Sequence, residues 1–325
     1  MVSSARRLGT DPGPLLEPEM SALGWKVPMG REVELPGRGT TFVRELPGPS
    51  PDAPTVILLH GLAATGGLNW FGCFGDLSER FRVLAIDHRG HGRGIRDAAR
   101  FRLADCADDV VALADVLGID RFVPVGYSMG GPIGQLVWHR HKDRVSGLVM
   151  CATSRNFRGR PRERVQFLGL GMLVAGLGGR IHLGSPGDAM NAGRVRRVFE
   201  SMLTPELLNG SQRPWMLSEL RRNDTNKVIE AAEAIGRFSS HAWIGQVDVP
   251  VSVVVTTRDW LVPVRRQVKL ARSIPSAVVF PIDGDHLVCA NQPEPFGRVV
   301  ADACRLVDRR TRQHRRGRGT LTALG

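Results

Sequence analysis

Short apolar runs alternate with longer segments of helical periodicity along most of the chain. Two alternating runs on either side of the turn residues 36–39 predict a hairpin near the N-terminus. Further on, buried strands are predicted at 55–61, 82–87, 122–125, 147–151, 249–259 and 277–282, and helices at 68–80, 103–117, 130–141, 264–273 and 293–308. This order is typical of an α/β protein whose mainly parallel sheet is covered by helices on both faces.

Residues 155–243 interrupt the alternation. They are helical in character, rich in arginine and glycine, and contain no clear strand. We therefore predict an α/β core made of residues 26–154 and 244–308, with a helical cap inserted over one edge of the sheet. Residues 1–25 and the basic tail at 309–325 are predicted to be disordered.

The composition adds limits to this picture. The chain has no run of about 18 or more apolar residues, which argues against a membrane-spanning helix, and the N-terminal segment lacks the apolar region of a secretory signal. The five cysteines are scattered without a Cys-x-x-Cys pair, so neither a disulfide framework nor a zinc site is expected. These features predict a cytoplasmic protein with reduced thiols.

The charge is unevenly distributed. The formal net charge is +12, and a cluster of arginines lies between Arg305 and Gly325. Such a tail can touch anionic lipid or nucleic acid, but a solvated terminus is the simpler interpretation. We expect no specific nucleic-acid partner. A weak contact of the cap or the tail with a membrane surface stays open, as does the oligomeric state.

The pattern G-x-S-x-G at 126–130 joins a predicted strand to a predicted helix. In that setting the serine sits on a strained turn that lifts its hydroxyl above the sheet, and small neighbours let the backbones approach. The following helix directs its positive N-terminal end toward the hydroxyl. Ser128 is therefore the predicted nucleophile.

A serine nucleophile needs a base, and the base needs an orienting acid. Asp259 follows one predicted strand and His286 follows the last one, which gives the chain order serine, acid, histidine. Because the carboxyl ends of parallel strands share one edge of a sheet, the three side chains are expected to meet there. Asp283 and Asp285 are rival acids, but Asp285 directly precedes His286, which makes a bond to its ring awkward.

Two backbone N–H groups are expected to bind the oxyanion of the tetrahedral intermediate. One belongs to Met129, directly after the nucleophile, and the other to Leu62 in the H-G-L loop after the strand at 55–61. His60 and Gly61 are predicted to support this loop, His60 by hydrogen bonding rather than as a second base.

Other motifs have simpler interpretations. The string D-H-R-G-H-G at 87–92 is favoured as a glycine-rich turn over a metal site, because no third ligand stands at a suitable spacing. The string G-L-G at 169–171 follows no buried strand, so no nucleotide cofactor is expected. Trp70 and Trp260 are candidates for the pocket lining, although both could equally be core residues.

Together these residues resemble the α/β-hydrolase superfamily, in particular its capped, lipase- and esterase-like members. The resemblance runs from about residue 30 to residue 305 and includes the H-G loop, the D-x-R-G-H-G turn, the GYSMGG elbow and the late G-x-H. It implies an eight-stranded, mostly parallel sheet with antiparallel first strands, and no cofactor. Members that open epoxides or remove halides carry aspartate where this chain has Ser128, which argues against both reactions.

The leading functional hypothesis is hydrolysis of a carboxylic ester of a small or lipid-like substrate through an acyl-enzyme. Hydrolysis of a carbon–carbon bond and acyl transfer are alternatives on the same fold, because an intact triad does not distinguish them. A non-catalytic binding protein on a hydrolase scaffold is an alternative of another class.

Overall fold

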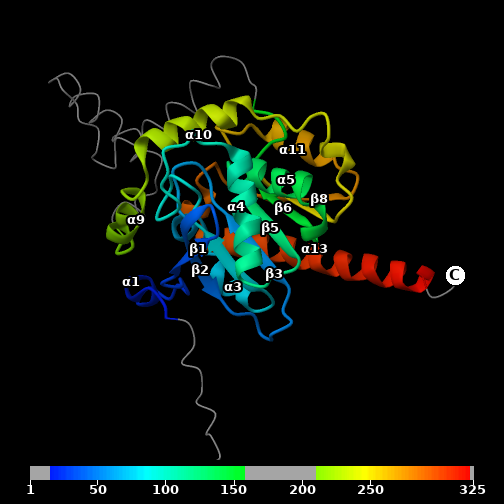
Figure 1. Ribbon diagram of the computed structural model, residues 1–325, viewed down its shortest axis with the longest axis horizontal. Coiled ribbons are helices and arrows are strands. Elements are labelled where there is room, and N and C mark those ends of the chain that lie inside the picture. The colour runs from blue at the N-terminus through cyan, green and yellow to red at the C-terminus, as the bar shows by residue number, and fades with distance from the viewer. Residues whose placement is uncertain (1–14, 158–209, 323–325) are drawn as a thin grey trace, which may run out of the picture.

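The computed structural model describes residues 15–157 and 210–322, and side chains as far as residue 313 (Figure 1). An eight-stranded sheet runs through the molecule in the order β1-β2-β4-β3-β5-β6-β7-β8, and β3 to β8 are mutually parallel. The strands are β1 (Arg31–Leu35), β2 (Gly39–Leu46), β3 (Thr55–Leu59), β4 (Arg82–Ile86), β5 (Phe122–Tyr127), β6 (Leu148–Cys151), β7 (Val251–Thr256) and β8 (Ala277–Ile282). The predicted hairpin and the mostly parallel sheet are confirmed.

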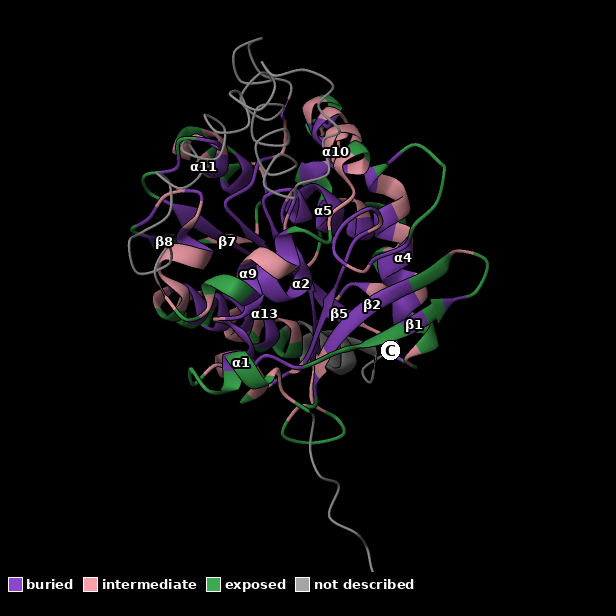
Figure 2. Ribbon diagram, turned by 90° about the vertical axis from the view of Figure 1, so that its left-hand side faces the viewer, coloured by how far each residue is buried: buried purple, intermediate pink, exposed green. Residues whose placement is uncertain are grey.

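Burial along the strands follows their place in the sheet. Every residue of β3 and β5 is buried, as expected for central strands that are covered on both faces. The edge strand β1 buries only Val33 and Leu35 and exposes its other three residues, so buried and exposed positions alternate at its end (Figure 2). This difference explains why the central strands appear in the sequence as continuous apolar runs.

Helices cover both faces of the sheet, and two apolar clusters form between the layers. One cluster lies under α4 (Leu103–Val116), α5 (Gly130–Arg140) and α11 (Val264–Arg272). The other lies under α3 (Phe74–Ser78) and α13 (Pro293–Thr322). Shorter elements are α1 (Pro18–Ser21), α2 (Gly66–Trp70), α12 (Val288–Asn291) and the 3₁₀ turns Lys142–Arg144 and Ile244–Gln246.

The predicted cap at 155–243 is described only at its two ends, since residues 158–209 lie outside the described ranges. Its second end forms α9 (Arg213–Leu220) and α10 (Thr225–Arg237), in agreement with the helical character expected from the sequence. α9 packs on α2, and α10 packs on α4. A covering role for the whole insertion stays a prediction.

Residues 68–80, predicted as one helix, form the two short helices α2 and α3 instead. The break contains Gly72. A methyl group added there would lie 2.6 Å from the carbonyl oxygen of Pro293, the first residue of α13. The chain between α2 and α3 thus packs closely against the start of α13.

The predicted disorder of residues 1–25 is wrong for the part that the structure describes. Residues 18–21 form α1, Leu16 forms a β-bridge with Pro28, and Met20 is fully buried. Glu17 forms an ion pair with the buried Arg44 of β2. These contacts with the sheet order a segment whose composition alone resembles a linker; residues 1–14 lie outside the described ranges.

The predicted end of the last helix at residue 308 is also wrong, because α13 continues to Thr322. Thr311 donates to the carbonyl oxygen of Ser146, and Asp308 accepts bonds from Arg80 and Arg312. These contacts carry the helix past the predicted boundary, and its end projects from the body of the molecule (Figure 1). None of the helices within the described ranges combines the length and the apolar character needed to cross a bilayer.

Candidate active site

The turn after β5 presents Ser128 in a strained backbone conformation, with a φ of +50°. Such a conformation is uncommon for a residue other than glycine and is typical of a nucleophile on a strand-to-helix turn. The neighbouring glycines allow the close backbone contacts that this turn requires. A methyl group would lie 2.2 Å from the carbonyl oxygen of Gly130 if added at Gly126, and 2.0 Å from that of Leu59 if added at Gly130.

The structure brings Ser128, His286 and Asp259 together in hydrogen-bonding order. Nε2 of His286 lies 2.9 Å from Oγ of Ser128, and Nδ1 of His286 lies 2.8 Å from Oδ2 of Asp259. All three side chains are at least nine-tenths buried. With the proton on Nδ1 facing the carboxylate, Nε2 is free to accept the proton of the hydroxyl.

The acid is held on both of its oxygens. Oδ1 of Asp259 accepts the backbone N–H groups of Leu261 and Val262, and Oδ2 accepts bonds from Thr256 and Gln267. Burial raises the pKa of Asp259, but the charge of His286 and these hydrogen bonds outweigh it, so the pKa lies below its ordinary value. The carboxylate thus stays ionised and fixed while it orients the ring.

The rival acids point elsewhere. Asp283 is exposed and pairs with Arg258, and Asp285 accepts the backbone N–H of Leu287 rather than a bond from the ring of His286. Trp260 is 38% exposed directly after Asp259. The structure places Trp70 in the core, fully buried against Tyr127 and Phe296, so its assignment to a pocket lining is not supported.

The loop after β3 lies against the nucleophile, since a methyl group added at Gly61 would be 3.4 Å from Cβ of Ser128. The peptide between Gly61 and Leu62 is trans, so its C=O and N–H point in opposite directions. Nδ1 of His60 lies 2.7 Å from that carbonyl oxygen. By holding the C=O, His60 fixes the direction of the N–H of Leu62.

The two N–H groups expected to bind the oxyanion belong to residues next to the nucleophile and next to the loop that lies against it. Met129 directly follows Ser128 and is the N-cap residue of α5, and the N–H of Leu62 belongs to the peptide that His60 holds. Within the described part of the chain neither group donates to a protein acceptor. Both are therefore available to an anionic oxygen formed on a substrate carbonyl.

His60 belongs to a cluster of buried histidines with His88 and His91, whose ring centroids lie 4.5 and 5.4 Å from that of His60. Nε2 of His60 accepts the backbone N–H of His88. Burial lowers all three pKa values: to about 3 for His88, to about 4 for His91 and well below the usual range for His60. The cluster is thus neutral, and the described residues contain no group of ligands arranged for a metal ion.

The sequence analysis missed two residues of the insertion that contact the loop after β3, which we call the oxyanion loop. Asn223 donates to the carbonyl oxygen of Ala63, a residue with a φ of +59°, and accepts the N–H of Gly92. Glu219, on α9, accepts the hydroxyl of Thr65, which caps α2. Their side chains lie more than 120 positions along the chain from the loop residues they bind, so no local pattern could have revealed them.

Comparison with known families agrees with this architecture. A family model described as the alpha/beta hydrolase fold matches residues 54–175, which include the oxyanion loop and the elbow. Together with the eight-stranded sheet, this match establishes the class of fold: the chain has the α/β-hydrolase fold.

Particular relatives narrow the comparison. The chain is 29% identical over 263 residues to a protein of Caulobacter sp. (strain K31) named "Putative carbamate hydrolase RutD", covering 78% of this chain and 91% of the relative. It also resembles the enol-lactonase of Burkholderia xenovorans LB400, with 24% identity, a TM-score of 0.66 and coverage of 84% and 99% of the two chains. A thermophilic esterase of Thermogutta terrifontis aligns at 21% identity with a TM-score of 0.64, over 86% and 99% of the two chains. At these identities the two structures support the fold alone.

Proposed function

We propose that the protein hydrolyses a carboxylic ester through an acyl-enzyme formed on Ser128. The observation that carries this proposal is the continuous hydrogen-bonded series from Ser128 through His286 to Asp259. The N–H groups of Met129 and Leu62, which donate to no protein acceptor in the described ranges, support it. A hydroxyl with a base, an oriented base and an oxyanion site is the arrangement that acyl transfer requires.

In the proposed reaction, His286 removes the proton of Ser128 as the hydroxyl attacks the acyl carbon. The N–H groups of Met129 and Leu62 bind the oxyanion, and Asp259 stabilises the imidazolium. The imidazolium then protonates the alcohol as it leaves. Water, activated by the same ring, attacks the acyl-enzyme and releases the acid.

Turnover of p-nitrophenyl esters of graded chain length tests the proposal. We expect measurable turnover by the wild type and a loss of about 10⁴- to 10⁶-fold in kcat for Ser128→Ala. Ser252→Ala is a matched control, because Ser252 is also buried but donates to the backbone carbonyl oxygen of Ala303 on α13. If Ser128→Ala keeps wild-type turnover, the assignment of the nucleophile fails.

A second candidate is hydrolysis of a carbamate, and the observation in its favour is the 29% identity to the Caulobacter protein of that name over most of both chains. The same attack by Ser128 would form a carbamoyl-enzyme in place of an acyl-enzyme. An aryl N-methylcarbamate and an aryl ester with the same leaving group separate the two. Turnover of the carbamate and none of the ester would favour the second candidate; the reverse result would favour the first.

A further inference from the structure

The residue directly before the nucleophile also contacts the loop of the base. Tyr127 is the last residue of β5, and its side chain is buried. Its hydroxyl donates to the backbone carbonyl oxygen of His286 at 2.7 Å. One side chain thus bridges the strand that presents Ser128 and the loop that presents His286, through a bond that lies outside the triad itself.

The ring of Tyr127 is held by the core. It packs edge to face against Trp70 and Phe296, with centroid distances of 6.1 and 5.5 Å, and both of these rings are fully buried. Burial raises the pKa of the Tyr127 phenol well above its ordinary value, so the hydroxyl keeps its proton and stays a donor at neutral pH. The hydroxyl is therefore a fixed point from which the loop after β8 can be held.

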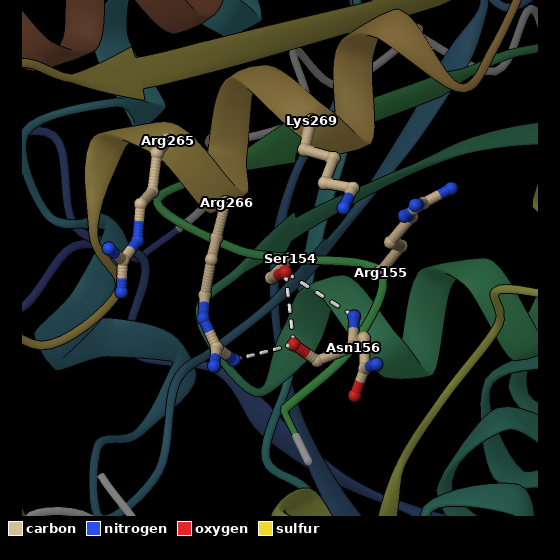
Figure 3. Close-up of a pocket in the computed structure, with 6 residues that line it drawn as sticks. All are labelled: Ser154, Arg155, Asn156, Arg265, Arg266 and Lys269. Carbon is tan, nitrogen blue, oxygen red and sulfur yellow. Dashed lines mark hydrogen bonds between the residues drawn. The ribbon is translucent and has the colours of Figure 1, made fainter. Parts of the chain in front are cut away.

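The backbone of the nucleophile is held independently of that hydroxyl. The N–H of Ser128 donates to the carbonyl oxygen of Cys151 in β6, and its own carbonyl oxygen accepts the hydroxyl of Thr153 in the loop after β6. α11 holds the same loop in turn, since Arg266 donates to the carbonyl oxygen of Asn156 beside the pocket drawn in Figure 3. The phenol hydroxyl is thus not needed to fix the position of the nucleophile.

The base differs from the nucleophile, because its loop is tied to both of its partners in the triad. The N–H of Arg258, directly before Asp259, donates to the carbonyl oxygen of Gly284 at 2.9 Å, which ties the loop to the segment of the acid. The bond from Tyr127 ties the loop to the strand of the nucleophile, at His286 itself. Since a displacement of about 1 Å can lower a rate by about 100-fold, this second bond affects the geometry of proton transfer.

We propose that Tyr127 is a positioning residue for the general base: by holding the carbonyl group of His286, it keeps Nε2 of that ring within reach of Oγ of Ser128. This inference rests on the proposed acyl-enzyme mechanism and extends it, since the proton passes through His286 in both the attack of the serine and the attack of water. Tyr127 acts through the base and needs no contact with the substrate. Its loss should therefore lower kcat and leave KM nearly unchanged.

Tyr127→Phe tests the proposal, because it retains the ring and its packing and removes the hydroxyl alone. We expect kcat for the preferred p-nitrophenyl ester to fall by about 10- to 100-fold, with little change in KM and a small decrease in Tm. The rate at which a fluorophosphonate phosphonylates Ser128 should fall by a similar factor, since that reaction also needs the base.

Cys289→Ala is the matched control for this variant. The thiol of Cys289 also bonds to the hydroxyl of Tyr127, so the alanine variant removes another partner of that hydroxyl and retains its bond to His286. We expect Cys289→Ala to match the wild type in kcat, KM and the rate of phosphonylation.

A second background separates positioning from a general structural role. In His286→Ala the ring to be positioned is absent, so the addition of Tyr127→Phe should change the residual turnover and the rate of phosphonylation very little. A merely structural hydroxyl would lower both rates by a similar factor in the two backgrounds, and that result would overturn the proposal. Wild-type kcat in Tyr127→Phe would also overturn it, as would a failure of this variant to fold, which would assign the hydroxyl to stability instead.

The two assays distinguish a failure of this inference from a failure of the proposed function, because phosphonylation needs an activated serine but no particular substrate. Slower phosphonylation in Tyr127→Phe, with no turnover of any ester by the wild type, would leave the positioning role standing and contradict ester hydrolysis. Turnover of esters, with equal kcat and equal rates of phosphonylation in the wild type and Tyr127→Phe, would contradict the positioning role and leave ester hydrolysis standing.

Discussion

A single buried histidine and a cluster of three lie at the carboxyl edge of the same sheet. His60 follows β3, His88 and His91 follow β4, and His286 follows β8. All are at least 95% buried, so neither burial nor position at a strand end distinguishes them. What differs is the partner of each ring. His286 lies between a carboxylate and a hydroxyl, whereas the other three face one another and the backbone.

This difference in partners gives His286 and His60 different roles under the proposed function. Asp259 stabilises a charged ring, so His286 can take a proton and return it during the proposed reaction. Burial without such a partner keeps His60 neutral, and a neutral ring can hold the carbonyl of Gly61 with one nitrogen while the other accepts the N–H of His88. Under the proposed function, one histidine moves a proton and the other keeps the oxyanion donor still.

The largest expected effect separates the two sets directly. His286→Ala should lower kcat by about 10⁴- to 10⁶-fold with little change in Tm, because it removes the base of the triad. His88→Leu should leave kcat on the order of the wild-type value, since its ring nitrogens bond to no described residue and its backbone N–H still reaches His60. Ester turnover and thermal unfolding of both variants test this expectation. Comparable losses of kcat in the two variants would contradict the different roles of His286 and His88.

A smaller effect is expected at His60. His60→Leu removes the hydrogen bond to the carbonyl of Gly61 and loosens the N–H of Leu62, which should lower kcat by roughly 10- to 100-fold with little change in KM. His60→Asn keeps an N–H near the position of Nδ1 and should lose less. Steady-state kinetics of the two variants measure this difference. Equal values of kcat for His60→Leu and His60→Asn would contradict the role of the His60 hydrogen bond in holding the peptide of Leu62.

The neutral cluster should also make the fold sensitive to acid. An unfolded histidine has a pKa of about 6.5, whereas His88 and His91 have pKa values of about 3 and about 4 in the folded chain. At pH values between the folded and the unfolded pKa, the unfolded state binds more protons than the folded state. The free energy of unfolding therefore falls as the pH falls, by about 2 kcal/mol for each of these two histidines between pH 7.5 and 5.

Asp87 acts in the opposite direction, because burial raises its pKa to about 6 and its folded form gains protons over part of this range. Urea unfolding of the wild type and of His88→Leu at the two pH values measures the balance. We expect the variant to lose less stability on acidification. Equal losses would mean that His88 is not kept neutral by the fold.

The smallest expected effect concerns the insertion. Asn223→Ala removes the bonds that tie the turn between α9 and α10 to Ala63 in the loop after β3 and to Gly92 in the turn after β4. We expect kcat to fall by about 3- to 10-fold with a lower Tm, because the N–H of Leu62 loses an indirect support. Asn226→Ala, at an exposed position of α10, is the control and should match the wild type in both assays.

Much of the candidate site could be predicted because it is tied to strand ends. The apolar runs of β5, β7 and β8 each stop just before a chemically suited residue, and parallel strands bring their carboxyl ends to one edge. The order serine, acid, histidine then identified Ser128, Asp259 and His286 without a structure. These residues depend on local patterns and on one topological rule.

The rest could not be predicted because it depends on contacts between distant segments. Asn223 and Glu219 reach the oxyanion loop from the insertion, and their own helices carry no sign of that partner. The ordered segment around Met20 and the extension of α13 past Asp308 likewise result from docking on the sheet and its neighbours, which their basic or proline-rich composition does not reveal.

The central claim is that His286 makes the hydroxyl of Ser128 nucleophilic. Mass spectrometry of the folded protein after reaction with a fluorophosphonate tests it most directly, since the reagent captures an activated serine and needs no knowledge of the substrate. The account predicts one adduct per chain, located on Ser128 and strongly reduced in His286→Ala. No adduct on the folded wild type, or labelling of Ser128 at an equal rate without His286, would contradict it.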